Sequence, residues 1–298
     1  MLLTVDSGTV NRVSALFSSL GLSRDRYEDP LLFPPKDDEA ERQLGFFLSM
    51  VGIDHRTRTE LTDFSAEIHG RSLSGADLLY YLGMKVYQGD ERSFTPRWLA
   101  HLVPEEAKHL LCFGDNCVWD FYTRIFLLRD LGKKVRKITD LLLVDSIEDL
   151  TSNLSSFRAY EDPVRKKTFL LAKFLDGRGL ARFSGEKHVP VDNHLTRIAV
   201  RLGIVLPSES LLESMRESRE LTREEDVEVR MVVRQAWKEV SARSGVDPFT
   251  LDDFLWPLGR LICTREPHCS KCPLSEVCRS NSTGEYWEEP RHTLTWYY

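Results

Sequence analysis

Residues 261–280, LICTREPHCSKCPLSEVCRS, place four cysteines within sixteen residues. Cys263, Cys269, Cys272 and Cys278 follow the spacing C-x5-C-x2-C-x5-C. Disulfides form in oxidising compartments, and the opening residues MLLTVDSGTVNRV have neither the basic flank nor the apolar run of a secretory signal. Structural zinc usually takes two close cysteine pairs, and only the central pair is that close here. We therefore expect a [4Fe–4S] cluster, with zinc and disulfides as the alternatives.

The remaining cysteines, Cys112 and Cys117, lie far upstream in an apolar context beside Trp119 and Phe121. A free cysteine in such a context usually behaves as a small buried apolar residue. We expect that role for both of them.

Composition describes an ordinary globular protein. The 298 residues are 42% hydrophobic and 29% charged, and no run of eighteen apolar residues predicts a membrane span. We expect a cytoplasmic monomer with no membrane partner. The net charge of −6 does not favour an extensive nucleic-acid surface, which needs an excess of cations to neutralise phosphates.

Apolar residues recur at helical spacing along most of the chain, which predicts an all-α fold. We expect a helical core over 1–260, in one or two subdomains, followed by the cluster loop over 261–280. The aromatic tail over 281–298 should pack back on the core. The expected helices cover 40–51, 75–87, 104–113, 118–135, 146–157, 165–175, 193–204, 208–218, 225–244 and 251–261.

The cysteine loop follows a helix near the end of the chain and resembles that of the endonuclease III and adenine-glycosylase branch of the helix-hairpin-helix DNA glycosylases. That branch spaces the cysteines six, two and five residues apart, and here the first gap is five. The resemblance implies a helix-hairpin-helix glycosylase core that carries a [4Fe–4S] loop.

A second segment supports the resemblance. Residues 188–204, HVPVDNHLTRIAVRLGI, look like the family's V-D-x-H-x-x-R segment. By this likeness Asp192 falls on the catalytic aspartate, and His194 and Arg197 fall on the flanking positions. The spacing of the apolar residues after Asp192 predicts a helix. The alternative, purely structural role of Asp192 is therefore the N-cap of that helix.

The implied chemistry explains why an aspartate is needed. Cleavage of the bond between a nucleobase and C1′ leaves oxocarbenium character on the sugar. A fixed carboxylate stabilises that charge and orients or deprotonates the nucleophile. In DNA the base must first leave the stack and enter a pocket.

The family's hairpin L-P-G-V-G-x-K corresponds to residues 160–179, YEDPVRKKTFLLAKFLDGRG. By this resemblance Lys167 falls on the Schiff-base lysine, and Arg165 and Lys166 lie where a phosphate would bind. The glycines are replaced by residues with a Cβ, which resist a tight turn with exposed amides. We therefore expect weak or absent lyase activity, and the alternative for Lys167 is a solvated cation.

Residues 161–203 carry nine Lys and Arg against five Asp and Glu, a net charge of +4. We expect this basic strip to make three or four phosphate contacts, unless it is a solvated helix face. The cations are Arg165, Lys166, Lys167, Lys173, Arg178, Arg182, Lys187, Arg197 and Arg201.

The chain is also similar to queuosine-salvage N-glycosylases, helical enzymes that hydrolyse a free nucleotide and lack the cysteine loop. The likeness lies in GRSLSGADLLYYL (70–82), EDVEVR (225–230) and LDDFLWPLGR (251–260), with Asp192 again the key carboxylate. It implies that GIDHRTRTEL (52–61) lies near the base pocket, where Asp54 and His55 bind the base edge. The alternatives are a helix-end cap for Asp54 and a surface histidine for His55.

Together these features predict an N-glycosylase, a hydrolase whose essential carboxylate is Asp192. The first expectation is a modified or mispaired base in DNA, as in base excision repair. The alternatives are a free modified nucleotide as substrate, or a cluster-bearing nucleic-acid-binding protein without catalysis.

Overall fold

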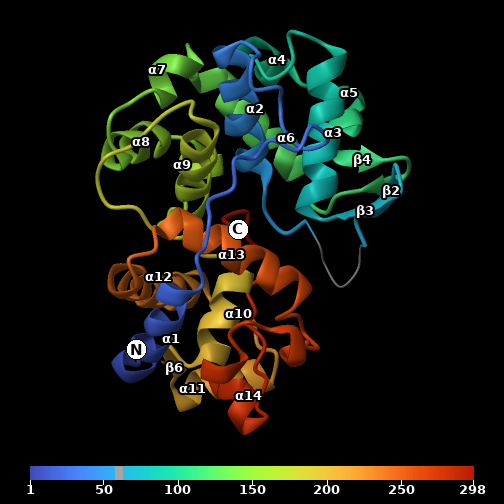
Figure 1. Ribbon diagram of the computed structural model, residues 1–298. Coiled ribbons are helices and arrows are strands. Elements are labelled where there is room, and N and C mark those ends of the chain that lie inside the picture. Colours follow the sequence, from blue (N-terminus) through green and yellow to red (C-terminus); the bar gives the residue numbers. More distant parts are fainter. Residues whose placement is uncertain (58–62) are drawn as a thin grey trace. The chain divides into compact units, whose positions relative to one another are not determined.

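The computed structural model describes residues 1–57 and 63–298 (Figure 1). Fourteen α-helices account for most of the regular structure in these ranges, which confirms the predicted all-α class. The chain divides into two compact units. Unit one contains residues 1–25 and 187–295, and unit two contains residues 26–186 and 296–298. No helix in the described ranges is both long and apolar enough to cross a membrane.

Unit one is organised around a buried helix, α10, which packs against α12 and α13. Trp237 of α12 is fully buried, and its indole nitrogen donates to the Leu195 carbonyl of α10 over 3.3 Å. Phe17 of α1 packs edge-on against that indole. The elements of unit one are β1 (Leu3–Val5), α1 (Ser7–Ser19), α10 (Asn193–Leu202), β6 (Val205–Pro207), α11 (Glu209–Arg216), α12 (Arg223–Ser244), α13 (Pro248–Leu261) and α14 (Arg279–Thr283).

Unit two is built around α2, which is buried on nearly every side and packs against α9, α6, α7 and α3. An aromatic cluster that includes Phe33, Phe47 and Phe174 fills the space beside α2. Its helices are α2 (Ala40–Ile53), α3 (Ala76–Gly89), α4 (Pro96–His101), α5 (Pro104–Leu111), α6 (Phe121–Lys134), α7 (Ile138–Leu142), α8 (Ile147–Leu154) and α9 (Lys166–Arg178).

Short antiparallel strand pairs accompany the helices, and the sequence did not predict them. In unit two β2 (Ser65–Ile68) pairs with β3 (Arg71–Ser74), and β4 (Cys112–Phe113) pairs with β5 (Asn116–Cys117). In unit one β1 pairs with β6. These strands have two to four residues, too few for an alternating pattern to stand out from the sequence.

Cys112 and Cys117 form a disulfide across β4 and β5, which corrects the expectation of two free buried cysteines. The two residues lie directly opposite each other in the hairpin, and their Cα atoms are 3.9 Å apart. Pairing follows from this register, which the apolar context of the cysteines did not reveal.

The aromatic tail packs back, as expected. Tyr297 and Tyr298 are each 5% exposed, and the Trp296 indole donates to the Arg158 carbonyl over 3.1 Å. These last residues belong to unit two.

Candidate functional site

The four clustered cysteines line one small cavity in unit one. Helix α13 ends just before Cys263, and single 3₁₀ turns at 269–271 and 275–277 carry the chain around the cavity. All four cysteines line this cavity, together with Arg201 and Tyr286. The loop therefore brings together the whole ligand set that the spacing predicted.

The cavity suits a group that binds thiolates at several corners. A [4Fe–4S] cubane takes one cysteine at each iron. Burial, together with the neighbouring cysteines, raises the pKa of the Cys272 and Cys278 thiols, so four thiolates would repel one another without a cation between them. No three His, Cys, Asp or Glu side chains of residues 1–57 and 63–298 form a site for a single metal ion.

Asp192 lies at the N-terminus of α10. One carboxylate oxygen, Oδ1, accepts the Leu195 amide over 3.0 Å, which makes Asp192 the N-cap, and the side chain is largely buried. The other oxygen makes no hydrogen bond within the described ranges. Capping therefore fixes the carboxylate while leaving one oxygen for another partner, so the two interpretations of Asp192 are compatible.

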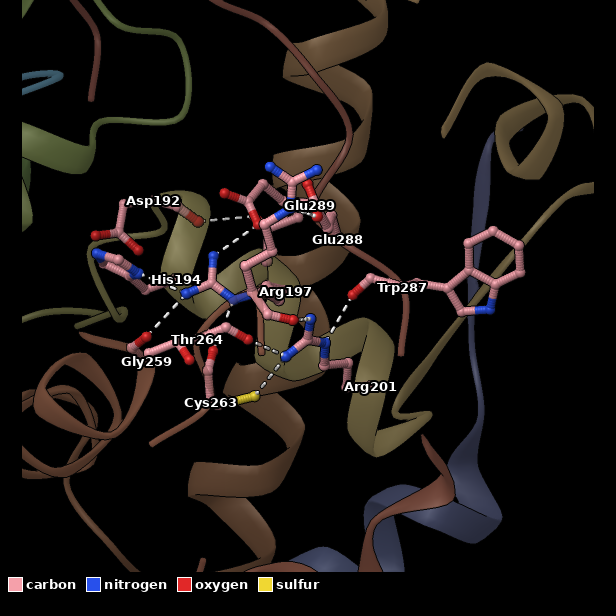
Figure 2. A network of polar contacts seen from close by, with 12 residues as sticks. Asp192, His194, Arg197, Arg201, Gly259, Cys263, Thr264, Trp287, Glu288 and Glu289 are labelled. Carbon is pink, nitrogen blue, oxygen red and sulfur yellow. Dashed lines mark hydrogen bonds and ion pairs between the residues drawn. The ribbon is translucent and has the colours of Figure 1, made fainter. Parts of the chain in front are cut away.

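The flanking candidates His194 and Arg197 form a network with the cluster loop (Figure 2). Arg197 donates to the carbonyls of Gly259 and Cys263, each over 2.8 Å, and pairs with Glu289 at 2.6 Å. It also lies 2.9 Å from Nδ1 of His194. Because Arg197 is a donor, Nδ1 is the acceptor and the neutral ring carries its proton on Nε2.

Close backbone approach accompanies this network. A Cβ added to Gly259 of α13 would lie 2.6 Å from the Cβ of His194. Glycine is therefore what lets α13 approach the start of α10. Burial lowers the pKa of His194, which keeps the ring neutral near pH 7.

One turn beyond Arg197, Arg201 reaches the cluster cavity from α10 (Figure 2). Its guanidinium donates to the carbonyls of Thr264 and Trp287 and lies 3.5 Å from the sulfur of Cys263. The same helix thus carries Asp192 at its start and a cavity-lining cation near its end.

The other catalytic candidate, Lys167, lies in unit two near the start of α9. Its side chain is fully buried, so the alternative of a solvated cation is wrong. The amine donates to the Gly52 carbonyl over 2.6 Å and lies 3.4 Å from Nδ1 of His55. Burial, with Lys166 and Arg124 nearby, lowers the pKa of Lys167 well below its usual value.

Candidate residues from the two resemblances lie together at the C-terminal end of α2. Lys166 donates to the Asp54 carbonyl over 3.2 Å, and His55 faces Lys167. Asp54 is the C-cap of α2. This position matches the helix-end cap that was predicted as the alternative to binding the base edge. The His55 side chain is fully buried, so it is not a surface histidine. Part of the segment 52–61, residues 58–61, lies outside the described residues.

A third cation, Arg124, lies at the C-terminal end of α2. Arg124 of α6 is fully buried and donates to the carbonyls of Ile53 and His55. Burial lowers the pKa of Arg124 to about 10, so the guanidinium stays charged near pH 7. Cations at a helix C-terminus satisfy its unpaired carbonyls. The sequence did not single out Arg124, because its partners lie about seventy residues away.

The hairpin before α9 binds its own carboxylate. Asp162 accepts the amides of Val164 and Lys166, each over 3.0 Å, at the position where the family presents amides to a phosphate. Arg165 has a φ of 62°, in the left-handed region that favours glycine. The backbone therefore still adopts a turn of the kind that glycine favours. The amides of Val164 and Lys166 in this turn, however, already donate to Asp162.

The prediction of an exposed basic strip over residues 161–203 is wrong. Six of its nine cations are buried: Lys166, Lys167, Lys173, Arg178, Arg197 and Arg201. Their charges are used inside each unit, for example by Arg178 on the carbonyls of Tyr27 and Pro34. Arg165 and Arg182 remain exposed.

Residues 170–289 match the AGOG family model, described as N-glycosylase/DNA lyase. The match covers less than half of the chain and is consistent with the helix-hairpin-helix glycosylase superfamily that the motifs indicated. It spans Asp192 and all four clustered cysteines, and supports a DNA N-glycosylase or lyase. No curated protein matches the chain.

Proposed function

We propose that the chain is a DNA N-glycosylase that removes a modified or mispaired base, with Asp192 as its essential carboxylate. The observation that carries this proposal is the position of Asp192, which lies at the start of α10 within the matched segment and has one carboxylate oxygen without a hydrogen bond in the described ranges. That oxygen would face the positive charge that develops at C1′ as the base leaves.

The Lys167 amine is the proposed nucleophile of a lyase step. In this step the lone pair of Nζ attacks the C1′ carbonyl carbon of an abasic site, the carbonyl oxygen leaves as water with the two amine protons, and a C1′=N imine remains. A lysine with a lowered pKa holds a larger share of the neutral amine near pH 7, which attack requires. Because the amine is buried, substrate reaches it only when the surrounding segment opens.

Borohydride reduction on DNA with an abasic site tests this nucleophile. We expect a covalent adduct with the wild type and none with Lys167→Gln, which keeps a donor for the Gly52 carbonyl. The exposed-site variant Lys133→Gln is the matched control and should form the adduct normally. Equal adduct in Lys167→Gln would exclude Lys167. No adduct in the wild type would restore the expectation, drawn from the missing glycines, that lyase activity is weak.

The proposed cofactor is a [4Fe–4S] cluster on Cys263, Cys269, Cys272 and Cys278. These cysteines line one cavity, and cluster ligation would fix the segment that follows α13. Arg201 donates to the neighbouring carbonyls and so positions the loop that carries Cys263.

Salt dependence separates a DNA substrate from a free nucleotide. With most of the basic strip buried, we expect about three phosphate contacts and a slope of log K against log salt of about −2.7. Duplex affinity should then fall about 40-fold between roughly 50 and 200 mM salt. Arg165→Glu should weaken binding, because Arg165 is an exposed cation of the hairpin. The exposed Arg92→Glu is the control with the same charge change.

No duplex or single-strand binding at low salt would contradict the DNA proposal. The second candidate, hydrolysis of a free modified nucleotide, would then take its place. Its support is the convergence of Asp54 and His55 with the cations Lys166 and Lys167 in one cluster. A panel of lesion duplexes and modified nucleotides, assayed for base release, tests both substrates directly.

A further inference from the structure

Three side chains of unit two form a row that ends at the proposed nucleophile. The Lys167 amine lies 3.4 Å from Nδ1 of His55, and Nε2 of His55 lies 3.7 Å from Oδ2 of Asp120. The residues come from α9, from the turn after α2 and from the start of α6. Nothing in the sequence indicated that Asp120 would meet the other two.

Asp120 lacks the usual structural role of an aspartate at this position. It is the N-cap of α6, but its side chain makes no capping hydrogen bond. Its φ of 65° lies in the left-handed region, which aspartate tolerates better than most residues. The carboxylate instead lies beside His55, whose Nε2 is buried without a hydrogen-bond partner in the described ranges.

Burial and the surrounding cations keep the His55 ring neutral. Burial is the largest cause of its lowered pKa, followed by Arg124, Lys167, Lys166 and Arg56. The Asp120 carboxylate lies beside the ring. It favours the tautomer with the proton on Nε2, and the lone pair of Nδ1 then faces Lys167. Two further carboxylates, Asp54 and Asp162, act on the lysine itself.

We propose that His55, oriented by Asp120, is the general base that accepts a proton from the Lys167 amine. This inference rests on the proposed role of Lys167 as nucleophile. When Nζ bonds to carbon, the nitrogen becomes positively charged and must lose a proton. That proton passes to Nδ1 of His55, and the electron pair of the N–H bond stays on Nζ. Hydrogen bonds of this kind are often long before substrate binds.

The test is reductive methylation with formaldehyde and cyanoborohydride, followed by peptide mass mapping, from pH 5 to 9. In the wild type Lys167 should be methylated, with a rate that rises steeply as pH increases, because both lysine and histidine must be deprotonated. His55→Asn keeps a short polar group but does not titrate. It should methylate Lys167 on the order of 100-fold more slowly, with a shallower pH profile, as loss of a proton acceptor predicts.

Asp120→Asn is the second variant, because it lies at a partly exposed helix start and leaves the packing of His55 in place. It should slow methylation several-fold. His109→Asn, an exposed histidine in α5, is the matched control and should behave as the wild type. Wild-type rates and pH profiles in both His55→Asn and Asp120→Asn would overturn the proposal. Absence of methylation at Lys167 in the wild type would also overturn it.

The probe contains no DNA, so it separates this inference from the proposed function. If methylation of Lys167 depends on His55 but neither the wild type nor any variant forms an adduct with abasic DNA, His55 accepts the proton from Lys167 and the lyase proposal fails. If DNA adducts form equally in the wild type and His55→Asn, Lys167 acts without this proton acceptor.

Discussion

Asp192→Asn should nearly abolish base release from the true substrate, while the fold and the cluster loop remain intact. The amide keeps the size of the side chain but removes the negative charge that would stabilise the oxocarbenium-like transition state. Loss of an electrostatic group of this kind costs about 100-fold to 1,000-fold in turnover. Base release from a lesion duplex, measured under single-turnover conditions, checks this expectation.

Stability distinguishes loss of chemistry from loss of the cap. Asparagine is about as good an N-cap as aspartate, so Asp192→Asn should unfold at the same temperature as the wild type. Asp192→Ala removes the acceptor for the Leu195 amide and should cost about 1 kcal/mol of stability. Asp247→Asn is the matched control, because Asp247 caps α13 in the same unit by the same kind of hydrogen bond. Near-normal turnover in Asp192→Asn would exclude Asp192 as the essential carboxylate.

Cys269→Ser should lose the cluster and destabilise the segment after α13. Wild-type protein, purified without oxygen, should be brown and contain about four irons per chain. Serine is a poor ligand for iron in such a cluster, so iron content and visible absorption should fall together. Because ligation supplies folding free energy to its loop, residues 263–280 should become sensitive to limited proteolysis.

Cys112→Ser is the matched control for this substitution. It removes a cysteine of the disulfide in unit two and should leave the iron content unchanged. Stoichiometric zinc in the wild type, in place of iron, would contradict the cluster proposal. Iron that survives in Cys269→Ser would show that Cys269 is not a ligand.

Local patterns predicted the parts of the site that depend on neighbouring residues in the chain. The spacing of the cysteines predicted that they would gather, and they line one cavity. The apolar pattern after Asp192 predicted a helix that begins there, and Asp192 caps α10. In both cases the relevant contacts span fewer than twenty residues.

The distribution of charged residues along the chain was the least informative signal for locating the site. Lys166 was expected at a phosphate and Lys167 as a nucleophile or a solvated cation, and the structure places both at carbonyls of the α2 end, more than a hundred residues away. A count of cations along the chain cannot show which of them have carbonyl partners in the fold. Asp120 and Arg124 were missed for the same reason, because no motif links them to His55.

The division of the chain has a consequence for the order of folding. Unit one is discontinuous: its first segment ends at residue 25 and its second begins at residue 187, so nearly all of unit two is an insertion within it. Strand β1 cannot meet β6 until Pro207 has been synthesised, about two hundred residues after its partner Leu3. Such distant contacts form slowly because closing a long loop costs entropy. On the ribosome, unit two can therefore fold first, and its folding brings the two halves of unit one within reach of each other.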